Sequence, residues 1–521
     1  MSNSLKNNLF IVFSAVIYSL SLLFFIIHDN YLLLVLPIVI TVVLVSVFNF
    51  KNLFFLLFFC TPISVSLADV TGLSSVDMAL PTEPILCGLM ILSMLFIIYH
   101  YNSFKDMLTH PITLLIILYL FWMFITCITS TMPIVSFKFL LTRIWYILPM
   151  FFIGSFFFKN TKNITYFILL YSIPLALVVL YTILKHSGYA FDKESAHYMM
   201  SPFFNDHTSY GAMIAFFIPL NIALLFVHNN NIIIKFITCC ILFVLFVGLV
   251  LSFTRAAWLS LFIAFLGGVV LRLKINQKVL FSSPLIIIIS VFFFQSYIID
   301  LLGKNTQNTS DNLLEHTTSI SNISTDASNV ERINRWHCAL YMFFDKPFFG
   351  WGPGTYQFQY APFQLLKYNT VIRTNTGDLG NAHSEYLGPL AESGILGFLS
   401  FCLLVYVVMY QAVRLYYDIE NPKIKILIFF VIISLTTYFI HGIFNNFLDT
   451  DKASIAIWSS IAMIVAIDSL NKKTSIRIQS LRTIFLKFIL YEESCFIHFY
   501  HIWLLFSSSS FGMYGQCSRC L

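Results

Sequence analysis

Charged residues are scarce in this chain: Asp, Glu, Lys and Arg together make up 10% of its 521 residues, whereas about 25% is usual in a soluble protein. Apolar residues make up 58%, against roughly 45–50% in an ordinary soluble protein. This composition excludes a soluble globular enzyme. Fourteen membrane spans of about 20 residues each would use about 54% of the chain, close to the apolar fraction.

The sequence also lacks the short segments of alternating apolar and polar residues that are typical of a membrane β-barrel. Its apolar runs are instead long, and the run at 232–251 is apolar on every face. In lipid, such a run satisfies its own backbone hydrogen bonds only as a helix. We see no internal repeat of fixed period, and no short cleavable signal peptide, because the first apolar run, 9–27, is followed directly by another.

A disulfide framework and a metal site are not indicated either. The chain has ten cysteines, but most lie singly within apolar runs, where a buried thiol is the usual explanation. Cys517 and Cys520 form one CxxC pair, which needs a second ligand pair before it indicates zinc. The outer loops contain no HExxH, no paired Cys and His ligands and no DxD-like carboxylate pair. We therefore expect a protein without a metal or another cofactor.

The apolar runs predict an all-α polytopic integral membrane protein. Pro62 interrupts one short run, so we expect about 12–14 transmembrane helices. The predicted spans are 9–27, 31–48, 52–67, 84–101, 112–130, 139–158, 164–184, 209–227, 232–251, 256–272, 279–302, 394–417, 424–446 and 453–470.

The charges in alternate loops predict the orientation. Seventeen of the thirty Lys and Arg residues gather in one set of loops and after the last span, whereas the other short loops are acidic. The positive-inside rule then places both termini in the cytoplasm. The basic set is Lys6, Lys51, Lys105, Lys159, Lys162, Lys235, Arg272, Lys274, Lys278, Arg414, Lys423, Lys425, Lys472, Lys473, Arg477, Arg482 and Lys487.

The same alternation places the longest polar stretch, 303–393, on the outer face, and loops of this size usually carry function. A short surface helix is expected over 329–344, capped by Ser328 and ended by Pro347. Its apolar side would consist of Val330, Ile333, Leu340, Phe343 and Phe344. We therefore divide the chain into three parts: N-terminal transmembrane helices at 1–208, a core at 209–470 that includes the loop, and a basic cytoplasmic tail at 471–521.

Four arginines on the outer side are candidates for binding an anion. Arg255 lies in a very short turn between two long spans, without an acidic neighbour, which is a costly place for a single charge. Arg332 and Arg335 are three residues apart on the predicted helix, so their side chains lie near one another. Several guanidinium groups converging from separate loops suit a pyrophosphate, because the planar fork binds phosphate oxygens in pairs.

Each of these arginines also has an ordinary explanation. For Arg143, just inside the span that begins at Phe139, we favour contact with phospholipid head groups over contact with substrate. For Arg332 and Arg335, the alternative is a solvated helix face bridged by Glu331.

The second cluster is Asn-Ala-His-Ser-Glu-Tyr-Leu at 381–387, near the membrane end of the long loop. His383 is the candidate base, since imidazole readily accepts a proton near neutral pH; an ordinary polar loop residue is the alternative. Glu385 and His207 are possible substrate contacts, and His207 could equally be structural. Gly352 and Gly354 belong to a glycine-rich turn that could cradle phosphate or act as a hinge.

Five segments, taken in order along the chain, resemble motifs of the O-antigen ligase and polymerase superfamily. They are S-F-T-R-A-A-W at 252–258, R-I-N-R-W at 332–336, D-K-P-F-F-G-W-G-P-G at 345–354, H-S-E-Y-L at 383–387 and A-E-S-G-I-L-G at 391–397. These are multispan enzymes of bacterial surface-polysaccharide assembly. The resemblance covers about residues 200–465, and the chain departs from it after about residue 490.

The resemblance implies a glycosyltransferase of the O-antigen ligase type on the periplasmic face of the bacterial inner membrane. It implies a metal-independent reaction between an undecaprenyl-pyrophosphate-linked glycan donor, held among membrane lipids, and a saccharide acceptor, with no nucleic acid involved. Arg255, Arg332 and Arg335 would neutralise the pyrophosphate, and His383 would accept the proton of the attacking hydroxyl. The acceptor is the lipid A core in a ligase and another lipid-linked repeat unit in a polymerase.

A transporter or flippase of lipid-linked sugars is a hypothesis from another class. It predicts internal repeats and charges near the middle of the bilayer, and the sequence shows neither clearly. A purely structural membrane protein would leave the arginines unexplained.

Overall fold

The structure is a computed structural model that describes residues 50–67, 78–228, 231–273, 327–364 and 380–472. The predicted spans 9–27, 31–48 and 279–302 lie outside the described residues, as do most of the predicted tail and the first part of the long loop. By its internal contacts the chain divides into two compact units, Met1–Ala466 and Ile467–Leu521. Everything described below belongs to the first unit, apart from the last turns of one helix.

The fold is all-α, as predicted, apart from a two-residue antiparallel pair that joins β1 (Val65–Ser66) to β2 (Ala79–Leu80). Among the described residues, ten helices are long and apolar enough to cross a membrane, and the chain is a multi-pass membrane protein. Each of the ten coincides with a predicted span.

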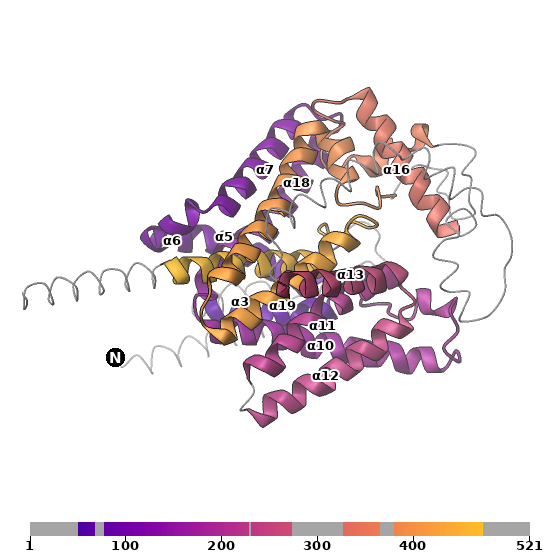
Figure 1. Cartoon of the computed structure of the whole chain (residues 1–521). Helices are drawn as coiled ribbons and strands as arrows, with labels where there is room; N and C mark the ends of the chain where they lie inside the picture. Colours follow the sequence, from indigo (N-terminus) through magenta and orange to yellow (C-terminus); the bar gives the residue numbers. More distant parts are fainter. Residues whose placement is uncertain (1–49, 68–77, 229–230, 274–326, 365–379, 473–521) are drawn as a thin grey trace, which may run out of the picture. The chain divides into compact units, whose positions relative to one another are not determined.

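The helices of the first half, shown in violet to purple in Figure 1, are α3 (Phe50–Cys60), α5 (Thr82–Tyr99), α6 (Tyr101–Leu108), α7 (Pro111–Ile128), α8 (Pro133–Ile147), the π-helical turn η3 (Leu148–Ile153), α9 (Gly154–Phe157) and α10 (Thr161–Ser187). Pro62 has the expected effect on the short run at 52–67: α3 ends at Cys60, followed by the 3₁₀ turn η2 (Thr61–Ile63). The apolar helical stretch Phe50–Ile63 is too short to be counted among the ten.

The helices of the second half are the 3₁₀ turn η4 (Ser195–His197), α11 (His207–Val227), α12 (Ile232–Leu251), α13 (Arg255–Arg272), α16 (Ala327–Asp345), α17 (Tyr356–Gln359), the 3₁₀ turn η5 (Ala361–Phe363), α18 (Leu387–Asp418), α19 (Pro422–His441) and a last helix, Asp451–Lys472. Polar caps begin several of them. The side chains of Asn160, Asp206, Asn231 and Asn421 accept backbone N–H groups at the starts of α10, α11, α12 and α19, as N-caps do.

Helix α11 lies at the centre of the second half and packs against α10, α12, α13 and α19 (Figure 1). Helix α7 packs against α18, and α18 in turn contacts α16 and α19. Helix α16, which carries Arg332 and Arg335, packs against α18 and the 3₁₀ turn η5.

Helix α18 begins earlier than the predicted span at 394–417 and is kinked inside. Gly394 has φ 66° and ψ −166°, and a Cβ there would lie 2.1 Å from the carbonyl oxygen of Phe348. The segment before α17 fills the kink: the backbone N–H of Ile395 donates to the carbonyl of Pro347 at 2.9 Å, and that of Gly352 donates to the carbonyl of Glu392 at 2.8 Å. The long loop is thereby fastened to the start of a membrane helix.

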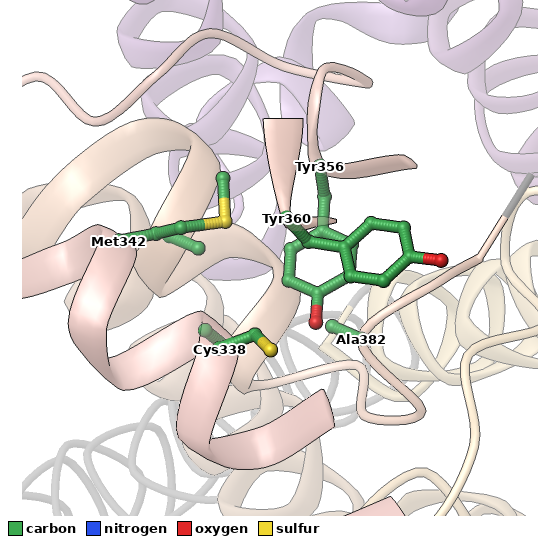
Figure 2. Packing of buried hydrophobic residues seen from close by; sticks show 7 residues of the cluster. Cys338, Met342, Tyr356, Tyr360 and Ala382 are labelled. Atoms are coloured by element: carbon green, nitrogen blue, oxygen red, sulfur yellow. The ribbon is translucent and has the colours of Figure 1, made fainter. Parts of the chain in front are cut away.

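The predicted helix at 329–344 exists as α16. Of its predicted apolar side, Phe344 is 71% exposed, and Ile333, Leu340 and Phe343 are half-buried. The side that packs against the protein consists of Cys338, Ala339 and Met342 with polar neighbours. These residues form a cluster with Tyr356, Tyr360 and Ala382, whose side chains point toward one another in Figure 2. The chain after the helix thus supplies the aromatic partners of this packed side.

In the described part of the chain every cysteine is a free thiol. Cys127 and Cys338 are buried, as expected, whereas Cys87, Cys239 and Cys240 lie on helix faces that the protein itself does not cover.

Candidate functional site

The candidate base sits in a constrained loop between Gly380 and α18. His383 has φ 47°, an uncommon conformation for a residue with a side chain, which surrounding contacts must hold in place. Its N–H donates to Asn381 Oδ1 at 3.1 Å, and its carbonyl accepts Nε1–H of Trp336 at 3.2 Å. Since Trp336 belongs to α16, the helix with the paired arginines also holds the histidine loop.

Arg335 is rigidly held beside this loop. Its side chain is 4% exposed, its Nε donates to Glu331 at 2.7 Å, and its Cζ lies 4.0 Å from the ring centroid of Tyr360. A Cβ at Gly380 would lie 1.5 Å from Nη1 of Arg335, so only glycine admits the guanidinium there. The predicted Glu331 pair exists, but it is buried, and the alternative of a solvated helix face is wrong for Arg335.

Arg332 is the electrostatic centre of the site. It interacts with the imidazoles of His207, His383 and His441, and Asp206 interacts with the same three groups. The starts of α11 and α16, the His383 loop and the end of α19 are thus brought together. This group is called the cationic cluster below.

Burial lowers the pKa of His383 to about 4, and repulsion from Arg332 and Arg335 acts in the same direction. Asp206 and a hydrogen bond with the Asn445 side chain oppose the shift. The imidazole is therefore neutral at physiological pH, and a neutral imidazole is the form that accepts a proton. An anion bound between the arginines would offset their charge and raise the pKa again.

Arg255 is the first residue of α13, in the predicted short turn between two spans. Its neighbour Thr254 donates through Oγ1 to the carbonyl of His207 at 2.8 Å, and a Cβ at Gly211 would lie 2.7 Å from that oxygen. The turn therefore packs tightly on the start of α11. The ring centroid of His207 lies 4.0 Å from that of His197. Because Thr254 binds the backbone of His207, the turn that carries Arg255 contacts the cationic cluster.

Arg143 does not reach a head group, and our preferred explanation from the sequence is wrong. The residue lies in the second half of α8 and is 6% exposed. It forms an ion pair with Asp449 and donates to the carbonyl of Leu448. It also lines a cavity of about 310 Å³.

Glu385 lines the same cavity and fastens two loops together. Its Oε1 accepts the hydroxyl of Tyr438 at 2.7 Å and the N–H groups of Phe447 and Leu448 at 2.6 and 2.8 Å. Burial raises the pKa of Glu385 to about 7, and Asp449 adds to the shift, while Arg143 and the hydrogen bonds oppose it.

The glycine-rich turn holds a carboxylate of the chain itself. Gly352 and Gly354 have φ 116° and 74°, and the backbone N–H groups of Gly354 and Tyr356 donate to the carboxylate of Glu392. A Cβ at Gly352 would lie 1.9 Å from Oγ of Ser130. Close packing and the bound carboxylate explain the glycines without a phosphate, and Gly354 also lines the cavity.

The sequence reasoning missed several residues that the structure places here. His441 ends an apolar span and is 1% exposed, and within the described residues neither ring nitrogen has a hydrogen-bond partner. An ionisable residue at the end of an apolar run was a signal that could have identified it. Asp206, Asn445 and Asp449 stand out only once the loops are assembled. Across the described ranges, no group of three or more His, Cys, Asp or Glu residues could hold a metal ion.

Comparison with known proteins gives one family match. The family described as O-antigen ligase matches residues 240–402, and no curated protein matches the chain. The matched region includes His383, Glu385, Gly352, Gly354 and the arginines at 255, 332 and 335, whereas Arg143 and His207 lie outside it. The match over residues 240–402 confirms the resemblance of this part of the chain to the O-antigen ligase and polymerase superfamily.

Proposed function

We propose that the chain is a glycosyltransferase of the O-antigen ligase type. It transfers an oligosaccharide from undecaprenyl pyrophosphate to a sugar hydroxyl of the lipid A core. The observation that carries the proposal is the position of His383, whose loop is held by Trp336 of α16 and whose imidazole lies within the electrostatic influence of Arg332 and Arg335. This arrangement offers a base and an anion site side by side, as the reaction requires.

The proposed reaction uses both halves of this arrangement. The acceptor hydroxyl attacks the anomeric carbon of the donor glycan and gives its proton to His383. The bond from that carbon to the pyrophosphate oxygen breaks, and its electron pair leaves with the pyrophosphate. Arg332 and Arg335, with Arg255 from the neighbouring turn, stabilise the charge on the leaving group, so it need not be protonated.

The low pKa of His383 fits this order of events. In the empty site, burial and the nearby arginines keep the imidazole neutral, so a base is ready before substrate arrives. The donor pyrophosphate would then offset the arginine charges and make the imidazole a stronger base. Substrate binding would thus raise the proton affinity of His383 at the stage when it must accept a proton.

The membrane setting completes the proposal. We infer an inner-membrane protein with both termini in the cytoplasm and the cationic cluster on the periplasmic side, as the distribution of basic residues indicates. The polyprenyl tail of the donor would lie in the bilayer among the spans, which explains why an enzyme for this donor is embedded.

The experiment replaces His383 with Ala in cells that lack the native gene. We expect surface polysaccharide transfer to fall by about 10²–10⁴-fold, the usual contribution of a positioned acid or base, while membrane insertion is unchanged. His100→Ala is the matched control, because His100 lies between α5 and α6, away from the cationic cluster. Unchanged polysaccharide in the His383→Ala strain would refute the role of the base.

The same deletion strain separates ligase from polymerase. Loss of all O-antigen with accumulation of lipid-linked polymer indicates the ligase. Single repeat units on the core, seen in a gel of lipopolysaccharide, indicate the polymerase, which uses the same chemistry with a lipid-linked acceptor.

A further inference from the structure

The cavity beside Arg143 is not used by the proposed chemistry. It has a volume of about 310 Å³ and lies between α7, α8, the turn before α17, the start of α18 and the loop that follows α19. This is at the lower end of the range for small-molecule sites, roughly 300–1,000 Å³. Its lining includes Asn381, Ala382, Ser384 and Glu385, which flank His383 on both sides.

The cavity is lined by side chains that can donate and accept hydrogen bonds, among them Gln357, Asn381 and Ser384. Arg143 and Asn446, which also line it, carry buried atoms, Nε and Oδ1, that have no hydrogen-bond partner among the described residues. A ligand that both donates and accepts matches such a lining, and hydroxyl groups do both.

The charge of the lining favours a neutral ligand over a phosphate. Glu385, Glu392 and Asp449 all line the cavity, and the one guanidinium there, that of Arg143, is already paired with Asp449. A phosphate would meet an excess of carboxylates and be repelled. The rings of Tyr119, Tyr356 and Phe401 supply apolar surface, which a pyranose with its alternating C–H and O–H groups can use.

We propose that this cavity binds a neutral sugar unit of the acceptor glycan. The inference rests on the proposed function and adds to it the position of the acceptor. His383 is not among the lining residues, so the reacting hydroxyl belongs to a part of the acceptor that extends from the cavity past the His383 loop. The donor and acceptor then approach the base from two regions that differ in charge.

Gly388 allows a specific test of this proposal. It lines the cavity in the first turn of α18, and a Cβ there would have no atom within 4 Å. Gly388→Leu therefore fills the cavity with little strain on the helix. Gly267→Leu is the matched control, because Gly267 lies within α13 and a Cβ there also has open space.

The assay uses the purified full-length chain, with lipid-linked glycan and lipopolysaccharide both extracted from the deletion strain. Lipid-linked repeat units replace lipopolysaccharide as the acceptor if that strain indicates a polymerase. We expect Gly388→Leu to raise KM for the acceptor about tenfold or more and to leave KM for the donor near that of the wild type. Gly267→Leu should match the wild type in both.

A second variant keeps the proposal testable if Gly388→Leu does not insert. Gln357→Ala removes a cavity-lining amide and should raise the acceptor KM selectively, by a smaller factor. The inference is overturned if Gly388→Leu inserts into the membrane and its acceptor KM equals that of the wild type. If only Gln357→Ala inserts, a wild-type acceptor KM in that variant overturns it. Either result leaves the proposed function intact. A wild-type chain that transfers nothing to either acceptor overturns the proposed function itself.

Discussion

One short loop separates two regions of opposite character. On one side, burial lowers the pKa of His383, and Arg332 and Arg335 add to the shift, so its imidazole is neutral. On the other, Glu385 and Asp449 line a cavity whose only guanidinium, that of Arg143, is already paired. Two substrates of different charge can be sorted by such a contrast, because the anionic donor is attracted to one region and repelled from the other. The loop that carries His383 and Glu385 lies between the two regions and would bring the two substrates together.

The largest effect on transfer should follow from weakening the binding of the leaving group by Arg335 without changing its charge. Arg335→Lys keeps one positive charge but loses the planar fork and the stacking on Tyr360, so donor kcat/KM should fall by about 10²-fold. Steady-state transfer at varied donor concentration measures this. Arg414→Lys is the control, since Arg414 forms a partly exposed pair with Asp418 far along α18.

Inorganic pyrophosphate distinguishes binding from folding in that variant. It should compete with the donor in the wild-type protein, and a higher pyrophosphate concentration should be needed in Arg335→Lys. Equal inhibition of both proteins, together with reduced activity, would mean that Arg335 supports the fold of the loop and does not bind the leaving group.

A smaller effect is expected at the residue that joins the two regions. Glu385→Ala leaves three buried donors, from Tyr438, Phe447 and Leu448, without their acceptor, and each costs about 1–3 kcal/mol. The shifted loop should lower transfer roughly tenfold and reduce the melting temperature. Glu385→Gln keeps the accepting oxygen and should stay close to the wild type in both measurements. Equal losses in the two variants would show that the charge of Glu385 matters more than its hydrogen bonds.

The spans could be predicted because lipid imposes a simple rule. Helices such as α12 and α13 satisfy their backbone internally, so length and apolarity alone locate them. The start of α18 was placed too late because its first turns carry Glu392 and Ser393. Glu392 accepts the N–H groups of Gly352 and Tyr356, and Ser393 pairs with Trp122 and Thr126 of α7. A linear hydropathy pattern contains no information about such partners.

The candidate arginines and the candidate base could be selected from the sequence, whereas His441, Asp206 and the cavity were missed. Arg255, Arg332, Arg335 and His383 belong to motifs that can be recognised in order along the chain. The partner of Arg143 is 306 residues away, so the residue looked like a lone cation near a head group. Residues that function through long-range pairs need the assembled fold to reveal them.

The smallest effect is a difference between two pH profiles, and it tests the coupling of donor and base directly. With a pKa of about 4, His383 is neutral in the free protein across pH 5–8, so kcat/KM should be flat over that range. Bound donor offsets the arginine charges and raises the pKa of His383. As the solution is acidified, kcat at saturating donor should therefore begin to fall at a higher pH than kcat/KM does. Glu385, whose pKa is raised to about 7, also titrates here, and the profiles are therefore measured in Glu385→Gln. Superimposed profiles would mean that the pyrophosphate does not lie near His383, because an anion between the arginines must change the proton affinity of an imidazole that both of them influence.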